Sequence, residues 1–206
     1  MAREPRHNHS LAFRAIFYGK SRGLMLRRAL LGRWIAPSHR LHQTGGATIG
    51  GAVLADDDSA LFTVSDPREQ ELELGKVQNL RVAAARLDRL VIPAGHTFSF
   101  WRQVGRTSRT KGFVVGRELR QGCLVPTIGG GICQLSNALH RVALAAGCRI
   151  DERHRHSAAV QDLVFDDATD ATLFWNYVDL RFTPSREMVL RVTLDDARLR
   201  VQLAAL

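Results

Sequence analysis

Two parts of the chain carry apolar residues at the spacing of a helix. The clearer set steps by three and four residues after a run of glycines and consists of Ile132, Leu135, Leu139, Val142 and Ala146. Residues at these steps share one helix face, and Gly147 is a suitable end because glycine adopts the left-handed conformation that closes many helices. The second set lies in Lys76 to Leu87. We therefore expect a main helix after the glycines and an earlier helix over Lys76 to Leu87.

Strand patterns dominate the rest of the second half. Met188 to Leu194 and Arg198 to Leu203 alternate apolar and polar residues around Asp195-Asp196, which predicts a hairpin. The polar run from Cys148 to Ser157 is expected to return from the main helix as a strand. Upstream, Leu90 to Gly95 is expected to be a strand that ends in a turn, with Thr97 to Trp101 extended after it.

This order of elements predicts an α+β fold: a single domain with a main helix that starts at Cys133, followed by antiparallel strands and a C-terminal hairpin. We expect the domain to span residues 70–206. Residues 43–69 begin with a glycine-rich uncharged stretch and continue into Asp56-Asp57-Asp58, so we expect a linker or irregular segment there. Lys111 to Val125 is interrupted by glycines and is expected to be a loop or short helix.

The first 42 residues form a basic leader, with nine basic residues and one acid, whereas the remainder of the chain has a net charge of only +1. Within it, Leu11 to Pro37 interleaves apolar, aromatic and basic residues. This composition is typical of an amphipathic element on an anionic membrane surface, and it contains neither a spanning apolar run nor a signal peptide. We therefore expect a cytoplasmic protein that binds the inner leaflet. The alternative is a helix packed on its own domain, neutralised by Ala55 to Leu74, whose net charge is −6. Nucleic-acid binding is not expected, since its recognised motifs are absent.

The three cysteines, at positions 123, 133 and 148, form an odd set that indicates reduced thiols. Cys133 falls in the first turn of the main helix, where free backbone N–H groups and the helix dipole stabilise a thiolate. In projection it lies beside Asn137 and His140, away from the apolar stripe. This favours a nucleophile, with the N–H groups of Gly131 to Cys133 available to an oxyanion. The alternatives are a buried thiol and a phosphate-binding turn, the latter weakened because no Gly-Lys-Ser/Thr sequence follows.

Two histidines follow the main helix. His154 and His156 share one face of the expected polar strand, so alternation alone does not choose between them as the base for the thiol. The second ring nitrogen of a base needs an acceptor, and either Asp170 or Asn176 is expected to orient it. The simpler alternative is that both histidines are solvated members of a charged strand. A zinc site is weaker still, because no Cys-x-x-Cys or His-Glu-x-x-His spacing is present.

These motifs resemble those of the VanW family, which is named for an accessory protein of vancomycin-resistance clusters. The resemblance covers roughly residues 75 to 184 and runs through Lys76 to Arg81, Phe98 to Trp101, Val104-Gly105, Lys111 to Phe113, Gly129 to Ser136, Glu152 to Ser157, Asp170 to Thr172 and Asn176 to Phe182. Domains of this family are associated with peptidoglycan L,D-transpeptidation through the cysteine of a Gly-Gly-x-Cys-Gln motif. The resemblance therefore implies that Cys133 is the nucleophile and that His156, which precedes a serine as in the family pattern, is preferred over His154 as the base.

The expected site also includes residues beside these groups. We expect Gly129, Gly130, Gly131 and Gln134 to form the oxyanion loop, and Arg153 and Ser136 to contact the substrate. No metal ion or other cofactor is expected.

Three functions remain open at this stage. The first is a cysteine enzyme that acts on peptidoglycan or its precursors by acyl transfer or amide hydrolysis, with a wall peptide as substrate. The second is a non-catalytic accessory or scaffold protein that binds wall precursors at the cytoplasmic membrane face, held there through residues 11–37. The third is a zinc-dependent hydrolase.

Overall fold

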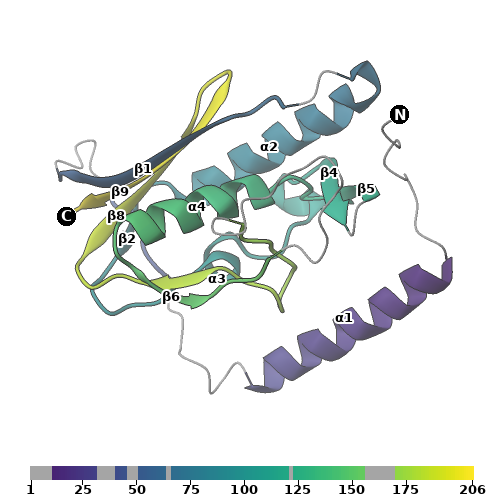
Figure 1. Cartoon of the computed structure of the whole chain (residues 1–206), viewed down its shortest axis with the longest axis horizontal. Coiled ribbons are helices and arrows are strands. Elements are labelled where there is room, and N and C mark those ends of the chain that lie inside the picture. The colour runs from purple at the N-terminus through teal and green to yellow at the C-terminus, as the bar shows by residue number, and fades with distance from the viewer. Residues whose placement is uncertain (1–10, 32–39, 46–50, 64–65, 121–122, 156–169) are drawn as a thin grey trace.

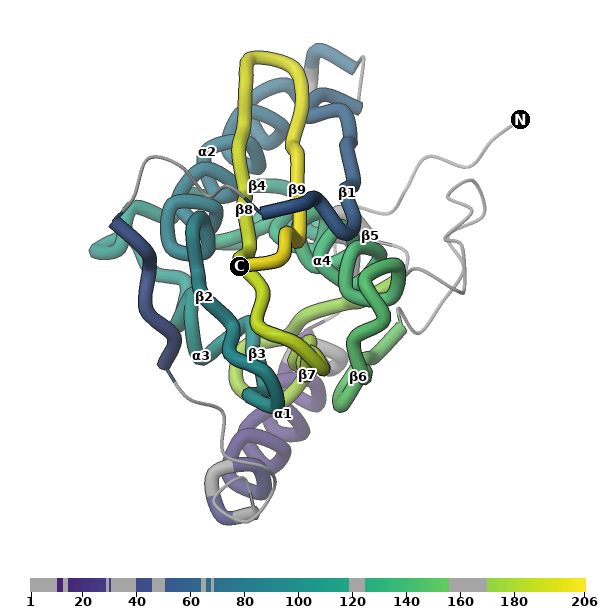
Figure 2. The backbone as a smooth tube through the Cα atoms, turned by 90° about the vertical axis from the view of Figure 1, so that its left-hand side faces the viewer, coloured from purple at the N-terminus to yellow at the C-terminus, as the bar shows by residue number. Residues whose placement is uncertain are grey.

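The computed structural model describes residues 11–31, 40–45, 51–63, 66–120, 123–155 and 170–206. They form helices and antiparallel strands, which confirms the predicted α+β class. The central sheet has four antiparallel strands in the order β1 (Val53–Ala60), β9 (Arg198–Ala205), β8 (Met188–Leu194) and β2 (Leu90–Ile92). The helices α2 (Gln70–Leu87) and α4 (Cys133–Ala145) pack against this sheet, α2 on β8 and α4 on β1 and β9 (Figures 1 and 2).

Two smaller sheets complete the domain. One has the order β3 (Phe98–Ser99), β7 (Arg181–Thr183) and β6 (Arg149–Glu152), and the other is a hairpin of β4 (Val115–Arg120) and β5 (Cys123–Ile128). The short helix α3 (Phe100–Val104) follows β3 directly, and single 3₁₀ turns lie at Pro67–Glu69 and Arg109–Lys111. Figure 2 shows β7 leading into β8, so the chain passes straight from the smaller sheet into the central one.

The core lies between the two helices and the central sheet. The predicted stripe of α4 is buried, with Leu135, Leu139 and Val142 fully enclosed, and Leu80 and Leu87 of α2 are equally buried. Each such side chain contributes roughly 1.5–3 kcal/mol through removal from water. The apolar periodicity therefore identified the core faces of both helices correctly.

The predicted linker contains a strand, so the expectation of an irregular segment over residues 43–69 is wrong for Val53–Ala60. Aspartates disfavour strands, but tertiary contacts outweigh that preference here. The strand pairs with β9, Asp57 accepts hydrogen bonds from Arg141 of α4 (Nη2–Oδ2 2.7 Å), and Asp58 accepts one from Arg198 (2.7 Å). Two of the three acids, Asp57 and Asp58, thus help to hold this edge strand in place.

Three further boundaries differ from the sequence prediction. The first domain helix begins at Gln70, six residues before the apolar spacing indicated. Part of the segment expected to be extended, Thr97 to Trp101, instead starts α3, because Ser99 caps that helix by accepting from the N–H of Arg102. Lys111 to Val125 contains the strand β4 rather than a loop or helix. Gly116 of β4 lies so close to α2 that a Cβ atom there would be 2.9 Å from the backbone nitrogen of Lys76. The glycine that this contact requires interrupts the alternation by which a strand is recognised in the sequence.

The basic leader contains α1 (Leu11–Leu31), which lies along one edge of the fold (Figure 1). Arg28 forms a two-pronged ion pair with Glu152 (2.6 and 2.8 Å), Ser21 contacts the hydroxyl of Tyr177 (3.2 Å), and the Phe17 ring meets that of Phe174 at 5.2 Å. The helix therefore packs on its own domain, and the ion pair that its described side chains make is with Glu152, which lies outside Ala55 to Leu74. Among the described residues, no helix is long and apolar enough to cross a membrane.

Candidate active site

Cys133 is the first residue of α4, as predicted, and it lines a cavity of about 110 Å³ that we call the thiol pocket. The pocket draws its lining from five parts of the chain: Trp101, Thr107, Glu118, residues 127–133 and residues 173–175. Two indole rings, those of Trp101 and Trp175, meet edge to face at 5.2 Å in its wall. The pocket thus combines a thiol, a glycine turn, an aromatic wall and one carboxylate.

The glycine turn is shaped by backbone conformations and close contacts that favour glycine. Gly129 and Gly131 have φ angles of 82° and 91°, in the left-handed region. A Cβ atom on Gly131 would lie 2.1 Å from Cγ of Lys76, and one on Gly130 would lie 2.3 Å from the carbonyl oxygen of Gly116. Asn79 of α2 fixes the turn from behind, because its amide donates to the carbonyl of Gly130 (2.9 Å). The turn is therefore held rigidly against α2 and β4.

Backbone donors gather where α4 begins. The helix has no side-chain cap, and the N–H groups of Gly131, Ile132 and Cys133 make no hydrogen bond to any residue that the structure describes. All three residues line the thiol pocket. Unpaired N–H groups at a helix N-terminus attract negative charge. Of the predicted oxyanion loop, only Gly131 has a free N–H, because the N–H groups of Gly129 and Gly130 donate to the carbonyls of Val114 (3.0 Å) and Thr127 (2.9 Å).

The electrostatic state of the thiol differs from the sequence prediction. Burial raises the pKa of Cys133 to about 11. This effect outweighs the hydrogen bond from the backbone N–H of Leu173, which lowers the pKa, and the charge of Glu118 raises it further. The thiol Sγ also lies 3.9 Å from the hydroxyl of Thr172. The expectation that the helix N-terminus would lower this pKa is therefore wrong for the resting structure. A nucleophilic Cys133 requires a base to remove its proton.

The structure describes one of the two candidate bases. His154 does not line the thiol pocket; its Nε2 lies 3.3 Å from Oε1 of Glu152, its side chain is 47% exposed, and its carbonyl accepts from the N–H of Thr172 (2.8 Å). The backbone of His154 is thus adjacent to the thiol's neighbour Thr172, while its ring turns to Glu152. His156 lies outside the described residues, and its role as base stays a prediction.

Of the two residues expected to orient the base, one lies near the thiol. Asp170 is buried, and its charge raises the pKa of Cys133, which places its carboxylate in that neighbourhood. Asn176 instead occupies an exposed turn between Phe174 and Val178 with a φ of 68°. Its sequence position reflects the turn conformation, which asparagine tolerates better than most residues. Asp170 rather than Asn176 thus lies near the thiol, and the choice between them as the residue that orients the base stays a prediction.

The three remaining predicted residues contact the protein itself. The Gln134 amide donates to the Ser59 hydroxyl (3.0 Å) and the Ala60 carbonyl (2.7 Å), so it ties α4 to β1 and faces away from the thiol pocket. Ser136 is fully buried, with its hydroxyl against the carbonyl of Ala171. That burial excludes the predicted substrate contact in this structure. Arg153 donates from Nε to the carbonyl of Asp170 (2.7 Å) and so braces the segment beside the thiol.

Sequence reasoning missed Glu118, Trp101, Trp175 and Asn79 as parts of the site. Each is more than ten positions from Cys133 in the sequence and comes near it only in the folded chain, so no local spacing indicates the contact. A signal did exist for Trp101 and Asn79, because both lie in segments that carry the family resemblance.

Metal chemistry finds no support in the described part of the chain, where no three histidine, cysteine, aspartate or glutamate side chains converge. His140, which the projection placed beside Cys133, is buried seven residues along α4 from it, or about 10 Å along the helix axis.

The sequence is similar to that of a known resistance protein. A family model described as "VanW like protein" matches residues 75–204. The vancomycin B-type resistance protein VanW of Enterococcus faecalis is 32% identical over 168 residues, which cover 79% of this chain and 61% of that protein. An uncharacterized protein, YoaR of Bacillus subtilis, is 35% identical over 104 residues, covering 50% of this chain and 34% of its own length. The chain thus spans less than two thirds of both relatives. No solved structure matches it.

Proposed function

The chain belongs to the VanW family, and from that premise we propose that it is a cysteine enzyme that acts on peptidoglycan or its precursors by acyl transfer or amide hydrolysis. A vancomycin-resistance relative points to wall peptides as the substrate class. The observation that carries the proposal is the convergence of the Cys133 thiol and the unpaired N–H groups of Gly131, Ile132 and Cys133 in one pocket. Acyl transfer needs these two features together.

In this mechanism Sγ of Cys133 attacks an amide carbonyl carbon as its proton passes to a base. The carbonyl oxygen becomes an oxyanion held by the backbone N–H groups of the glycine turn. The C–N bond breaks when the base returns the proton to the leaving amine. An amine or a water molecule then attacks the thioester and releases the thiol, which completes transpeptidation or hydrolysis respectively.

The raised pKa of the thiol restricts the choice of base. A thiol whose pKa burial raises to about 11 gives up its proton more readily to a stronger base, and imidazole is intrinsically more basic than a carboxylate. A histidine is therefore a better base than Glu118. We keep His156 as the base, with Asp170 as its orienting acceptor, and assign Glu118 to a cationic amine of the substrate.

The test is the covalent intermediate. We expect the full chain, incubated with a synthetic wall stem peptide, to gain the mass of the acyl fragment at Cys133, as measured by intact and peptide mass spectrometry. Cys133→Ala should abolish the adduct, and Cys148→Ala should retain it because Cys148 is buried in the core. His156→Ala should slow its formation more than His154→Ala. An adduct that persists in Cys133→Ala would refute the assignment.

A second candidate is a non-catalytic accessory protein that binds the same wall peptides. The observation in its favour is the resting thiol, whose pKa of about 11 leaves it protonated at neutral pH. Here Cys133→Ser should bind the stem peptide as tightly as the parent chain and support the same resistance phenotype. Loss of the phenotype with retained binding would favour the enzyme.

We also propose that α1 binds an anionic membrane surface at the cytoplasmic face. At about 100° per residue, the exposed side chains of Ile16, Leu26 and Leu30 fall on the face opposite Phe17, Ser21 and Arg28, which contact the domain. Lys20, Arg22 and Arg27 flank this apolar face. Such a stripe bordered by cations suits the boundary between headgroups and acyl chains.

Flotation with phosphatidylglycerol vesicles tests this location. Ile16→Ser/Leu26→Ser/Leu30→Ser should lose binding, since it removes the inserted side chains without touching those that pack on the domain. Lys20→Gln/Arg27→Gln should weaken binding in a salt-dependent way. If the triple variant floats as well as the parent chain, α1 is not the membrane contact.

A further inference from the structure

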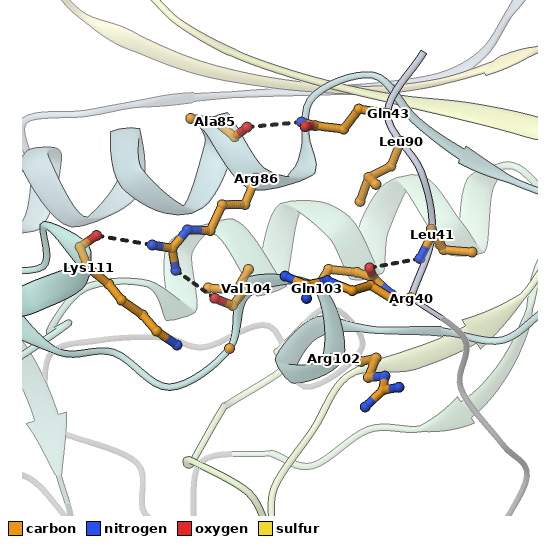
Figure 3. Close-up of a pocket in the computed structure, with 11 residues that line it drawn as sticks. Arg40, Leu41, Gln43, Ala85, Arg86, Leu90, Arg102, Gln103, Val104 and Lys111 are labelled. Atoms are coloured by element: carbon orange, nitrogen blue, oxygen red, sulfur yellow. Dashed lines mark hydrogen bonds between the residues drawn. The ribbon is translucent and has the colours of Figure 1, made fainter.

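Four cations surround a second cavity, of about 530 Å³, which we call the cationic pocket. They come from separate parts of the chain: Arg40 precedes β1, Arg86 lies on α2, Arg102 on α3 and Lys111 in the following 3₁₀ turn. No aspartate or glutamate is among the residues that line it. Figure 3 shows Arg40, Arg86, Arg102 and Lys111 around the same space. This concentration of positive charge has no counterpart in the thiol pocket.

Arg86 is the fixed member of the set. Its guanidinium donates to the carbonyls of Val104 (2.6 Å) and Lys111 (3.0 Å), as Figure 3 shows, and lies over the Phe113 ring at 5.2 Å. Burial and the charge of Arg40 lower the pKa of Arg86. The protein therefore holds like charges near one another, an arrangement that an anion would stabilise.

The other three cations are available to a ligand. Arg40, Arg102 and Lys111 are exposed, and none forms an ion pair with a residue that the structure describes. The backbone makes room for one of them: Gly105 has a φ of 73° and a ψ of −177°, and a Cβ atom there would lie 3.0 Å from Nζ of Lys111. The Lys111 ammonium thus lies against bare backbone at the pocket wall.

We propose that the cationic pocket binds a phosphate or diphosphate group carried by a small molecule. Its volume falls within the range of small-molecule sites, about 300–1,000 Å³, and exceeds what a bare phosphate ion fills. Several arginines and a lysine around one space match a multiply charged group with several acceptor oxygens better than they match a single carboxylate. The inference does not depend on the chemistry of Cys133, because no residue lines both pockets.

Titration calorimetry of the full chain with inorganic pyrophosphate tests the site. The variant Arg40→Gln/Arg102→Gln neutralises two exposed side chains, and Arg86 is left intact because its guanidinium also crosslinks two carbonyls. The matched control Arg81→Gln/Arg186→Gln removes the same charge from exposed positions outside the pocket. We expect about a tenfold loss of affinity in the pocket variant and less than about a twofold change in the control.

Equal losses in both variants, or no binding by the parent chain at millimolar pyrophosphate, would overturn the proposal. Thermal unfolding should confirm that both variants remain folded. Cys133→Ser should bind pyrophosphate normally, so a failed acyl-enzyme test and a failed anion test remain distinguishable.

The source of the phosphate follows from vesicles of phosphatidylglycerol and of phosphatidylcholine. If the pocket variant, but not the control, also loses phosphatidylglycerol binding and pyrophosphate displaces the parent chain, the phosphate is that of a lipid headgroup. If vesicle binding is unchanged while pyrophosphate binding falls, the ligand is a soluble phosphorylated molecule. Either result supports a phosphate site.

Discussion

The thiol pocket and the cationic pocket share one segment of chain but are built on opposite principles. Trp101 and Thr107 line the first, whereas Arg102 and Lys111 line the second. The thiol pocket is small, is shaped by rigid backbone, and buries a thiol whose pKa is raised to about 11. The cationic pocket is larger and is lined by four long basic side chains, three of them exposed. A precisely positioned backbone suits bond-making chemistry, whereas a cluster of cations suits the capture of an anion.

The largest test of this contrast replaces one glycine in each pocket by alanine. Gly131→Ala should destabilise the fold by more than about 3 kcal/mol, because its Cβ would meet Lys76, a buried side chain held by Glu73 at 2.8 Å. Gly105→Ala should cost only about 2 kcal/mol, since its conformation is strained but the nearest atom is the mobile end of Lys111. Chemical denaturation measures both. Equal costs would show that the two walls are similarly rigid.

The next test concerns Glu152, which holds α1 beside the wall of the thiol pocket. Burial raises its pKa, but hydrogen bonds from His154 and Arg28 outweigh burial and bring the pKa to about 2. A carboxylate with a depressed folded-state pKa stabilises the fold above its unfolded pKa, and that stability is lost as the pH falls through the folded value. Glu152→Gln should therefore cost up to about 3 kcal/mol at neutral pH, and the difference from the parent chain should vanish between about pH 4.3 and pH 2.

Asp179 has the opposite effect on the pH dependence of stability, because its pKa is raised whereas that of Glu152 is lowered. Burial raises its pKa to about 6 despite hydrogen bonds from Ser99 and Trp101. The folded state then favours the protonated acid, so this group costs stability as the pH rises from about 4 to 6. Asp179→Asn should flatten that part of the stability profile and leave the change below pH 4.3 in place. A gap between Glu152→Gln and the parent chain that persists to pH 2 contradicts the role given to Glu152.

The third test compares two thiols whose pKa burial raises to the same value of about 11. Cys133 lines a pocket, whereas Cys148 is buried with its Sγ 4.0 Å from the sulfur of Met188. In a Cys123→Ser background, iodoacetamide should modify Cys133 about a hundredfold faster, because Cys148 reacts only after local opening. The Cys133 rate should still rise at pH 10. A plateau near neutral pH would reveal a thiolate–imidazolium pair and contradict a neutral resting thiol.

Much of the fold was predictable because local patterns coincide with buried faces. The apolar stripes of α2 and α4 and the C-terminal hairpin were all visible as periodicity. β1 was not predicted, because three consecutive aspartates are typical of a loop. Its stabilising partners, Arg141 and Arg198, are close to it only in the folded chain. Local reasoning has no access to partners that are 84 and 140 residues away.

The site divides in the same way. Cys133 was recognisable because the glycine turn and the start of α4 are adjacent in sequence. Its raised pKa was not, since it depends on the burial of the thiol in the folded chain and on the charge of Glu118. Gln134 and Ser136 lie within three residues of the cysteine, but their side chains contact β1 and Ala171. A sequence motif does not indicate these side-chain directions. In the cationic pocket, Gly105 and Lys111 lie in segments that carry the family resemblance, but no sequence pattern brings them beside Arg40 and Arg86.

The smallest expected effect isolates the charge crowding in the cationic pocket. Arg40→Gln should leave stability unchanged or raise it by a few tenths of a kcal/mol at low salt, because it removes an exposed cation that disfavours the charged form of Arg86. Arg102 does not contribute to the lowered pKa of Arg86, so Arg102→Gln should have no such effect on stability. Salt at about 0.5 M should erase the difference by screening. With saturating pyrophosphate the order should reverse, since the parent chain then gains more binding free energy than Arg40→Gln. Destabilisation by Arg40→Gln without ligand would instead show that Arg40 has a structural role in the fold, and the crowding argument would lose its basis.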